Sequence, residues 1–171
     1  TTLARLAVVT GGGKWDAVAS DHERLLAEAN GGGDPRRALG ALEDLVRAHP
    51  AYPRITMLRL AIANGWEREG HAERSLEGLR SALRGASSSE RTRAGLELAR
   101  ALIRQRELDE AEATLDALAS NPGADRAAIG EVRELLATAA RRAWLRGALW
   151  IVLCVLALGA GLTLRRDAGS W

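Results

Sequence analysis

The segment from Leu6 to Lys14, LAVVTGGGK, has the residue types of a phosphate-binding loop, with an apolar run followed by glycines and a lysine. A Walker-type loop needs a glycine five residues before its Gly-Lys pair and a Ser or Thr after the lysine, because these groups surround the phosphates and their Mg²⁺. This chain has Val8 and Trp15 at those positions. The dinucleotide-binding spacing also fails, since Asp16 stands where the third glycine is needed. We therefore expect a plain turn leading into a helix.

The histidines and the cysteine do not have the spacing of a metal site. His22, His49 and His71 fall in three different elements, and none has a second His or Cys at the distance that zinc ligands need. We expect each histidine to lie on the surface or to cap a helix. Cys154 is the single cysteine and lies inside an apolar run, so neither an internal disulfide nor a thiolate metal site is available.

Three carboxylates, Asp109, Glu110 and Glu112, gather on one short segment and have the chemistry of acid–base catalysis. They stand beside Arg104 and Arg106 in the sequence, which favours a solvated helix face with ion pairs. No Ser/His/Asp or Cys/His set can be assembled around them. The sequence therefore predicts a protein that is not an enzyme and that binds no cofactor.

Charge is balanced along the chain. The formal net charge is +2, 27% of the residues are charged, and acids and bases are interspersed. Nucleic-acid binding needs a basic stripe with aromatic stacking residues, and the sequence has neither, so we expect no nucleic-acid partner. Lys14 is the only lysine among 24 basic residues, and this bias, with abundant Ala and Gly, favours a bacterial source with a GC-rich genome.

The elements that must position these side chains are amphipathic helices. Apolar residues recur at intervals of three and four, as in Leu108, Ala111, Leu115 and Leu118, and no stretch alternates apolar and polar residues as a strand does. Glycine and proline clusters divide the chain, which predicts an all-α fold of antiparallel helices with short connections. We expect helices over residues 14–29, 35–48, 54–69, 71–84, 90–106, 108–120 and 124–140, the last leading into an apolar segment.

An internal repeat relates three helix pairs. Aligning Ala38, Ser75 and Ala111 superposes three segments at spacings of 37 and 36 residues. Further columns then agree without adjustment: Leu42, Leu79 and Leu115; Leu45, Ala82 and Leu118; Leu25, Ile62 and Leu98; Leu26, Ala63 and Ala99; and Ala29, Trp66 and Leu102. Large and small residues occupy the positions where neighbouring hairpins must stack.

The repeat resembles the tetratricopeptide repeat (TPR) family, whose helix pairs place a small residue where two helices cross closely. The Ala38 column would be that crossing, and the stretch from Arg106 to Pro122, RELDEAEATLDALASNP, is the best match. The resemblance covers about residues 19 to 123, and it departs from the family at Leu26, where a small residue is usual, and in repeats two or three residues longer. It implies hairpins stacked as a right-handed solenoid, each burying its face against its neighbours.

In proteins of that family the first helix of each pair lines a groove that binds a partner protein. The family's ligand-facing columns carry over here to Glu23, Ala27, Met57, Asn64, Arg93 and Arg100. Asparagine at the Asn64 column binds a peptide backbone or a terminal carboxylate in some members. Arg104 follows Arg100 by one helical turn, and together with Arg93 these arginines can meet an acidic partner segment.

The sequence changes character near its C-terminus. Gly147 to Leu164, GALWIVLCVLALGAGLTL, is eighteen residues without a charge. A helix of that length is about 27 Å long, close to the roughly 30 Å hydrocarbon core of a bilayer. Tryptophan and arginine suit the two interfaces, and a small-xxx-small pair suits helix pairing. The residues expected in these roles are Trp144, Arg146, Trp150, Ala157, Gly161, Arg165 and Arg166.

Basic residues are more numerous before this apolar run than after it, which favours a cytoplasmic N-terminal domain, with the bacterial inner membrane as the expected location. Only seven residues, RRDAGSW, follow the run, so we expect insertion after synthesis, as for a tail anchor. The expected organisation is an N-terminal extension or cap (1–13), three TPR-like hairpins (14–123), a capping and connecting helix (124–142), a transmembrane helix (143–166) and a short tail (167–171).

The sequence thus predicts a single-pass, membrane-anchored scaffold or adaptor that binds a partner protein near the bilayer, in the assembly of a membrane complex. The alternative is a structural accessory subunit of a multi-subunit membrane complex, with its transmembrane helix packed against other subunits. A third reading, an enzyme or a cofactor-assembly module, depends on the breadth of the family alone.

Overall fold

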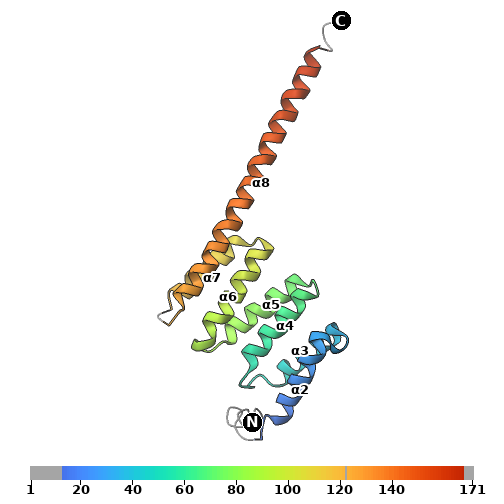
Figure 1. The fold of residues 1–171 in the computed structure, drawn as a ribbon, viewed down its shortest axis with the longest axis vertical. Helices are drawn as coiled ribbons and strands as arrows, with labels where there is room; N and C mark the ends of the chain where they lie inside the picture. The colour runs from blue at the N-terminus through green and yellow to red at the C-terminus, as the bar shows by residue number, and fades with distance from the viewer. Residues whose placement is uncertain (1–12, 122, 168–171) are drawn as a thin grey trace.

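A computed structural model describes residues 13–121 and 123–167 of the chain, with the side chains of residues 32, 149 and 151–167 outside the description. This part of the chain is all helical, with seven α-helices and no strand, which confirms the predicted all-α class (Figure 1). The elements are α2 (Asp16–Ala27), η1 (Glu28–Gly32, a π-helical turn), α3 (Pro35–Ala48), α4 (Ile55–Arg68), α5 (Ala72–Gly85), α6 (Ser88–Gln105), α7 (Leu108–Ala119) and α8 (Arg126–Asp167).

Local capping chemistry sets several helix ends. The Asp34 side chain accepts hydrogen bonds from the backbone N–H groups of Arg36 and Arg37, at 3.0 and 3.3 Å, and so satisfies free donors at the start of α3. Ser87 and Glu90 form a capping box, which explains why α6 begins two residues before the predicted position of 90. Arg106 ends α6 in the left-handed conformation, with φ of 66°.

The largest differences from the expected boundaries lie in the first and the last helix. The helix predicted over residues 14–29 ends as α-helix at Ala27 and continues as η1, in which Gly31 takes a φ of 151° that favours glycine. The helix predicted over 124–140 and the following apolar segment form one continuous helix, α8, of 42 residues. No proline interrupts residues 126–167, so the backbone hydrogen bonds continue through the expected boundary at 142.

Consecutive helices pair as three hairpins, α2/α3, α4/α5 and α6/α7, which follow one another along the molecule (Figure 1). Each helix packs against the next one in the chain, so α3 contacts α4 and α5 contacts α6. The first helices also meet across the hairpins, since α4 contacts α6 and α6 contacts α8. The start of α8 therefore takes the place that a fourth hairpin would occupy, and its remainder extends away from the others.

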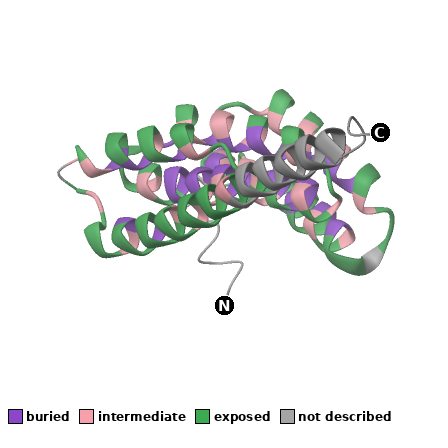
Figure 2. Ribbon diagram, turned by 90° about the horizontal axis from the view of Figure 1, so that it is seen from above, coloured by how far each residue is buried: buried purple, intermediate pink, exposed green. Residues whose placement is uncertain are grey.

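The core follows the columns of the sequence repeat. Ala38, Ser75 and Ala111 are all buried, which places the small residues at the hairpin crossings. Leu42, Leu79 and Leu115 are fully buried beside them. Figure 2 shows buried residues on the faces that the helices turn toward one another and exposed residues on their outer faces. The burial of these two columns in three successive hairpins is consistent with a helical repeat.

Ion pairs connect each unit to the next at one repeated position. The column that contains Glu43, Arg80 and Asp116 lies on the second helix of each hairpin. Glu43 pairs with Arg74, and Arg80 pairs with Glu110 at 2.6 Å. Asp116 pairs with Arg133 of α8, also at 2.6 Å. The sign of the charge in this column alternates from acid to base to acid.

Within the residues that the structure describes, no helix meets the length and hydropathy needed to cross a membrane. The predicted transmembrane segment falls mostly on residues 151–167, whose side chains lie outside the description. Ala157, Gly161, Arg165 and Arg166 are among them. The N-terminal extension predicted over residues 1–13 lies outside the described residues except at its last position.

Candidate partner-binding surface

The groove residues predicted from the TPR resemblance lie on the first helix of each hairpin and are accessible. Glu23 and Ala27 are exposed on α2, and Arg93 is exposed on α6. Met57, on α4, leaves 39% of its surface exposed although it is a large apolar residue. Asn64, seven residues after Met57 on the same helix, is exposed as well. The structure brings the α4 and α6 positions onto neighbouring helices, whereas α2 packs against α3 and η1.

Two of the predicted groove arginines already have carboxylate partners. Arg104 of α6 makes a bidentate pair with Glu67 of α4, with its Nη2 at 2.7 Å from Oε2. Arg100 pairs with Glu97 of its own helix at 3.1 Å. Exposed pairs of this kind contribute about 0–1 kcal/mol, so a carboxylate or phosphate of a ligand can compete for either guanidinium. Arg104 therefore joins two hairpins as well as facing outward.

A basic cavity of about 360 Å³ lies where α8 passes over α6 and the start of α7. Five of its lining residues are arginines, the others are apolar apart from Thr138, and no acid lines it. We call it the arginine pocket, after Arg100, Arg104, Arg106, Arg142 and Arg146. It contains two predicted groove residues and one residue predicted to lie at the membrane interface.

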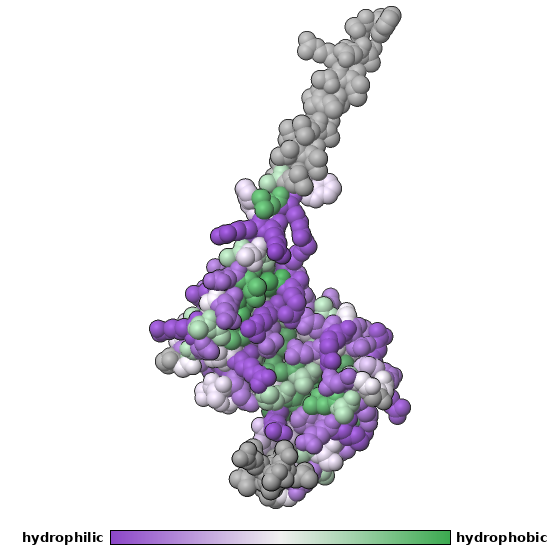
Figure 3. Space-filling view, in the orientation of Figure 1, coloured by the Kyte–Doolittle hydropathy of each residue, from purple (hydrophilic) through white to green (hydrophobic). Residues whose placement is uncertain are grey.

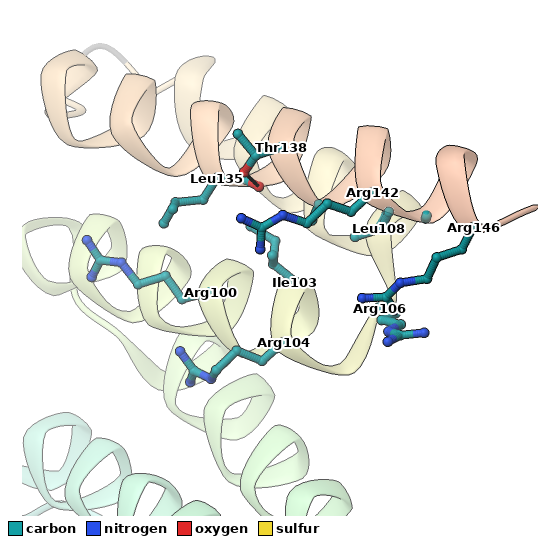
Figure 4. Close-up of a pocket in the computed structure, with 11 residues that line it drawn as sticks. Arg100, Ile103, Arg104, Arg106, Leu108, Leu135, Thr138, Arg142 and Arg146 are labelled. Carbon is teal, nitrogen blue, oxygen red and sulfur yellow. Dashed lines mark hydrogen bonds between the residues drawn. The ribbon is translucent and has the colours of Figure 1, made fainter. Parts of the chain in front are cut away.

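Three elements position the guanidinium groups of the arginine pocket (Figure 4). Arg142 extends from α8 toward Ile103 of α6, and Arg146 lies one helical turn further along α8. Arg106 comes from the link between α6 and α7, where its left-handed backbone ends α6. Figure 3 shows hydrophilic side chains gathered around the base of α8, with hydrophobic side chains beside them. The pocket thus combines positive charge with an apolar wall.

A second cavity, of about 520 Å³, lies on α3, α4 and α5 and is lined by groups that satisfy one another. Trp66 donates its Nε1–H to Glu43 at 2.6 Å. The guanidinium of Arg74 stacks over the Trp66 ring at 3.9 Å and also pairs with Glu43. Because Trp66, Arg74 and Glu43 are paired with one another, this cluster connects the first two hairpins.

The expected surface or capping role is wrong for one histidine. His22 is buried in α2, and its Nδ1 lies 3.3 Å from the Tyr52 hydroxyl. Burial lowers the pKa of His22, and the charge of Arg54 lowers it further, while Glu23 opposes the shift. His49 and His71 do lie at the end of α3 and the start of α5, as expected. No group of His, Cys, Asp and Glu able to hold a metal is found among the described side chains.

The acidic segment of α7 is exposed, as expected, and one of its carboxylates pairs with a residue of another helix. Glu110 binds Arg80 of α5, at 2.6 and 2.9 Å, and does not pair with Arg104 or Arg106. The hydrogen bond from Arg80 is the main cause of a lowered pKa for Glu110. This carboxylate is held ionised as a link between the second and third hairpins. It lacks the raised pKa that a general acid needs near neutral pH.

Most of the arginine pocket was not predicted from the sequence. Arg146 was expected only at the membrane interface, and Ile103 and Leu135 had no expected role. The spacing of Leu135, Ala139, Arg142 and Arg146 places them on one face of a helix, which is a signal that the sequence contains. That this face turns toward α6 follows only from the packing of α8.

Comparison with known proteins finds no match, since no protein family, curated protein or solved structure is recognisably similar to this chain.

Proposed function

We propose that this protein is a membrane-anchored, TPR-like scaffold or adaptor, in which the three hairpins bind a partner protein and α8 attaches them to a bilayer. The hairpins would stack as a right-handed solenoid of the TPR type, with α2, α4 and α6 along the binding groove. Neither catalysis nor a cofactor is part of this proposal. The role is to hold a partner near the membrane, in the assembly of a membrane complex.

The observation that carries the proposal is the change of exposure along α8. Ile129 and Val132 are buried against α6 and α7 in the first turns. Further along the same helix Trp144, Leu145 and Trp150 leave 72, 59 and 69% of their surfaces exposed. Exposed large apolar residues next to one another mark a contact with a membrane or a protein, and tryptophan is typical of the membrane interface. They stand immediately before and within the uncharged run that begins at Gly147.

The partner-binding half of the proposal is supported by the surface of the first helices. Among the described side chains of the three hairpins, Met57 is the one large apolar residue that is exposed. Asn64 lies about two turns further along the same helix. Arg93 lies on the neighbouring helix α6 and is exposed. An apolar anchor, an amide and a cation on adjacent helices suit an extended acidic segment of a partner.

Site-specific photo-cross-linking in the native membrane tests both halves. A photo-reactive residue replaces Asn64 or Arg93 on the first helices, and the matched control replaces the exposed Arg84 on the second helix α5. We expect a discrete cross-linked partner from the two groove positions and none from Arg84, with all of the protein in the membrane fraction after carbonate extraction. Equal cross-linking from both surfaces, or release of the protein by carbonate, would contradict the proposal.

The same preparation discriminates the accessory-subunit alternative. If the protein is an accessory subunit, gentle detergent extraction followed by size-exclusion chromatography would show it together with a fixed set of membrane proteins at constant ratio. A partner that dissociates at moderate ionic strength supports the adaptor, because screened contacts to arginines are weak at high salt.

A further inference from the structure

We propose that the arginine pocket binds the phosphate headgroup of an anionic phospholipid, so that the lipid joins α6 to α8. The inference deepens the proposed function, since it depends on α8 meeting a membrane for the supply of that lipid. Lipid binding is measured in detergent and does not require membrane anchoring, so this inference and the proposed function can fail separately.

Uncompensated charge is the first reason. Arg100 and Arg104 have their carboxylate partners, Glu97 and Glu67. The remaining three pocket arginines, Arg106, Arg142 and Arg146, form no ion pair with any carboxylate that the structure describes. Cations gathered around one cavity repel one another unless an anion sits between them, and guanidinium binds phosphate through two parallel hydrogen bonds.

The apolar wall is the second reason, because it separates a lipid from a free anion. Ile103 and Leu108 are half-buried in the wall, and Leu135 reaches the same cavity with 51% of its surface exposed. Inorganic phosphate gains nothing from such a wall. The glycerol and first acyl carbons of a phospholipid would cover it, at about 25 cal/mol for each Å² of apolar surface removed from water.

The position of the pocket on α8 is the third reason. The lining face of α8 runs from Leu135 to Arg146, and the exposed Trp144, Leu145 and Trp150 begin at the same level of the helix. Basic pockets at the end of a membrane helix recognise anionic headgroups. An acidic peptide of the partner would instead be expected in the groove of α4 and α6, on the side of Met57 and Asn64. The lipid is therefore the occupant that the surroundings favour.

The test uses the full chain in a non-ionic detergent, with dioctanoyl phosphatidylglycerol as the probe and its effect on the thermal midpoint as the readout. Dioctanoyl phosphatidylcholine, inorganic phosphate and a short glutamate-rich peptide are the comparison ligands. Arg142→Gln is the informative variant, because Arg142 is exposed and unpaired among the described carboxylates, so its loss should leave the fold intact. Arg141→Gln is the matched control, since it removes the same charge from the adjacent residue, which does not line the pocket.

We expect phosphatidylglycerol to raise the midpoint and phosphatidylcholine to leave it unchanged. Arg142→Gln should weaken phosphatidylglycerol binding about tenfold or more, the usual effect of losing a charge-assisted hydrogen bond, while Arg141→Gln stays within about twofold of wild type. Inorganic phosphate that binds as tightly as the lipid would overturn the inference in favour of a free anion. Tighter binding of the acidic peptide, or equal effects of the two variants, would overturn it as well.

Discussion

The first and third hairpins share one plan but differ in how their interiors are filled. In the third, α6 and α7 bury only alanine, leucine and glycine, and α8 covers their outer side with Ile129 and Val132. In the first, α2 buries His22 against Tyr52, and Trp15 contacts Tyr52 edge to face with ring centroids 5.8 Å apart. Leu26 is half-buried where Ala63 and Ala99 are fully buried in the later hairpins.

The difference teaches that a repeated sequence column need not give equal stability in each copy. A small residue allows two helices to approach closely, and alanine occupies this column in the second and third hairpins, whereas the first has the larger Leu26 there. The first hairpin compensates with aromatic contacts and a buried histidine. We expect amide hydrogen exchange to be fastest in α2 and slowest in α6.

Glycine substitutions should show the largest contrast between the two hairpins. A Cβ atom at Gly95 in α6 would lie 2.6 Å from Cδ2 of the buried Leu118, so Gly95→Ala overpacks the third hairpin. We expect the free energy of unfolding to fall by about 1–2 kcal/mol, even after a helix-propensity gain of about 1 kcal/mol. Urea denaturation followed by circular dichroism measures this change.

The matched control is Gly40→Ala in α3 of the first hairpin. No atom lies within 4 Å of a Cβ built there, so only the backbone effect remains. The free energy of unfolding should rise by about 0.5–1 kcal/mol. A gain of stability from Gly95→Ala would contradict the packing described for α6 and α7, and a loss from Gly40→Ala would contradict the open space beside α3.

The middle hairpin allows a smaller test at the crossing column. Ser75 is fully buried and its Oγ has no hydrogen-bond partner among the described atoms, whereas the equivalent residues of the other hairpins are Ala38 and Ala111. An unsatisfied buried hydroxyl costs about 1 kcal/mol or more, so Ser75→Ala should stabilise the protein by about 1 kcal/mol. The reciprocal change, Ala111→Ser, should lower the stability of the third hairpin by a similar amount. A destabilising Ser75→Ala would mean that the hydroxyl has a partner.

The smallest expected effect is the pH dependence of the first hairpin. The pKa of His22 lies below its ordinary value of 6.5 in the folded state, because burial disfavours the charged ring. The unfolded chain therefore binds the proton more readily. The contribution of neutral His22 to the free energy of unfolding is fully present above pH 6.5 and decreases as the pH falls from 6.5 to the lowered pKa. Thermal midpoints of wild type between about pH 7.5 and about pH 5.5 should decline on the acid side.

His22→Gln should remove this decline, since glutamine does not titrate and can still meet the Tyr52 hydroxyl. Glu90 and Glu110, whose pKa values are lowered, stabilise the fold fully above their ordinary pKa of 4.5, so they add no pH dependence within this range. If the thermal midpoint of His22→Gln declined with pH as in the wild type, a group other than His22 would be responsible for the decline.

Local pattern was enough to predict the helices and the repeat, because burial at intervals of three and four residues fixes which side chain enters the core. The same pattern could have placed His22 inside, since it shares a face with Val18, Ala19 and Leu25. Ion pairs between hairpins were not predictable in the same way. Arg104 meets Glu67 across 37 residues of sequence and Arg80 meets Glu110 across 30, and whether such residues come close in space depends on how the helices pack. The arginine pocket could not be predicted for the same reason, because it exists only where α8 packs against α6.

The alternating ion pairs between successive units favour one order of the hairpins over others. Removal of the middle hairpin would bring Glu43 to face Glu110, and removal of the third would bring Arg80 to face Arg133. Each loss replaces an attraction by a repulsion between like charges, although the apolar residues of the repeat would still be able to pack. Only the loss of both hairpins restores an opposite pair, between Glu43 and Arg133. A shorter chain that lacked only the middle or only the third hairpin would therefore need a change of charge in this column to keep an ion pair at each junction.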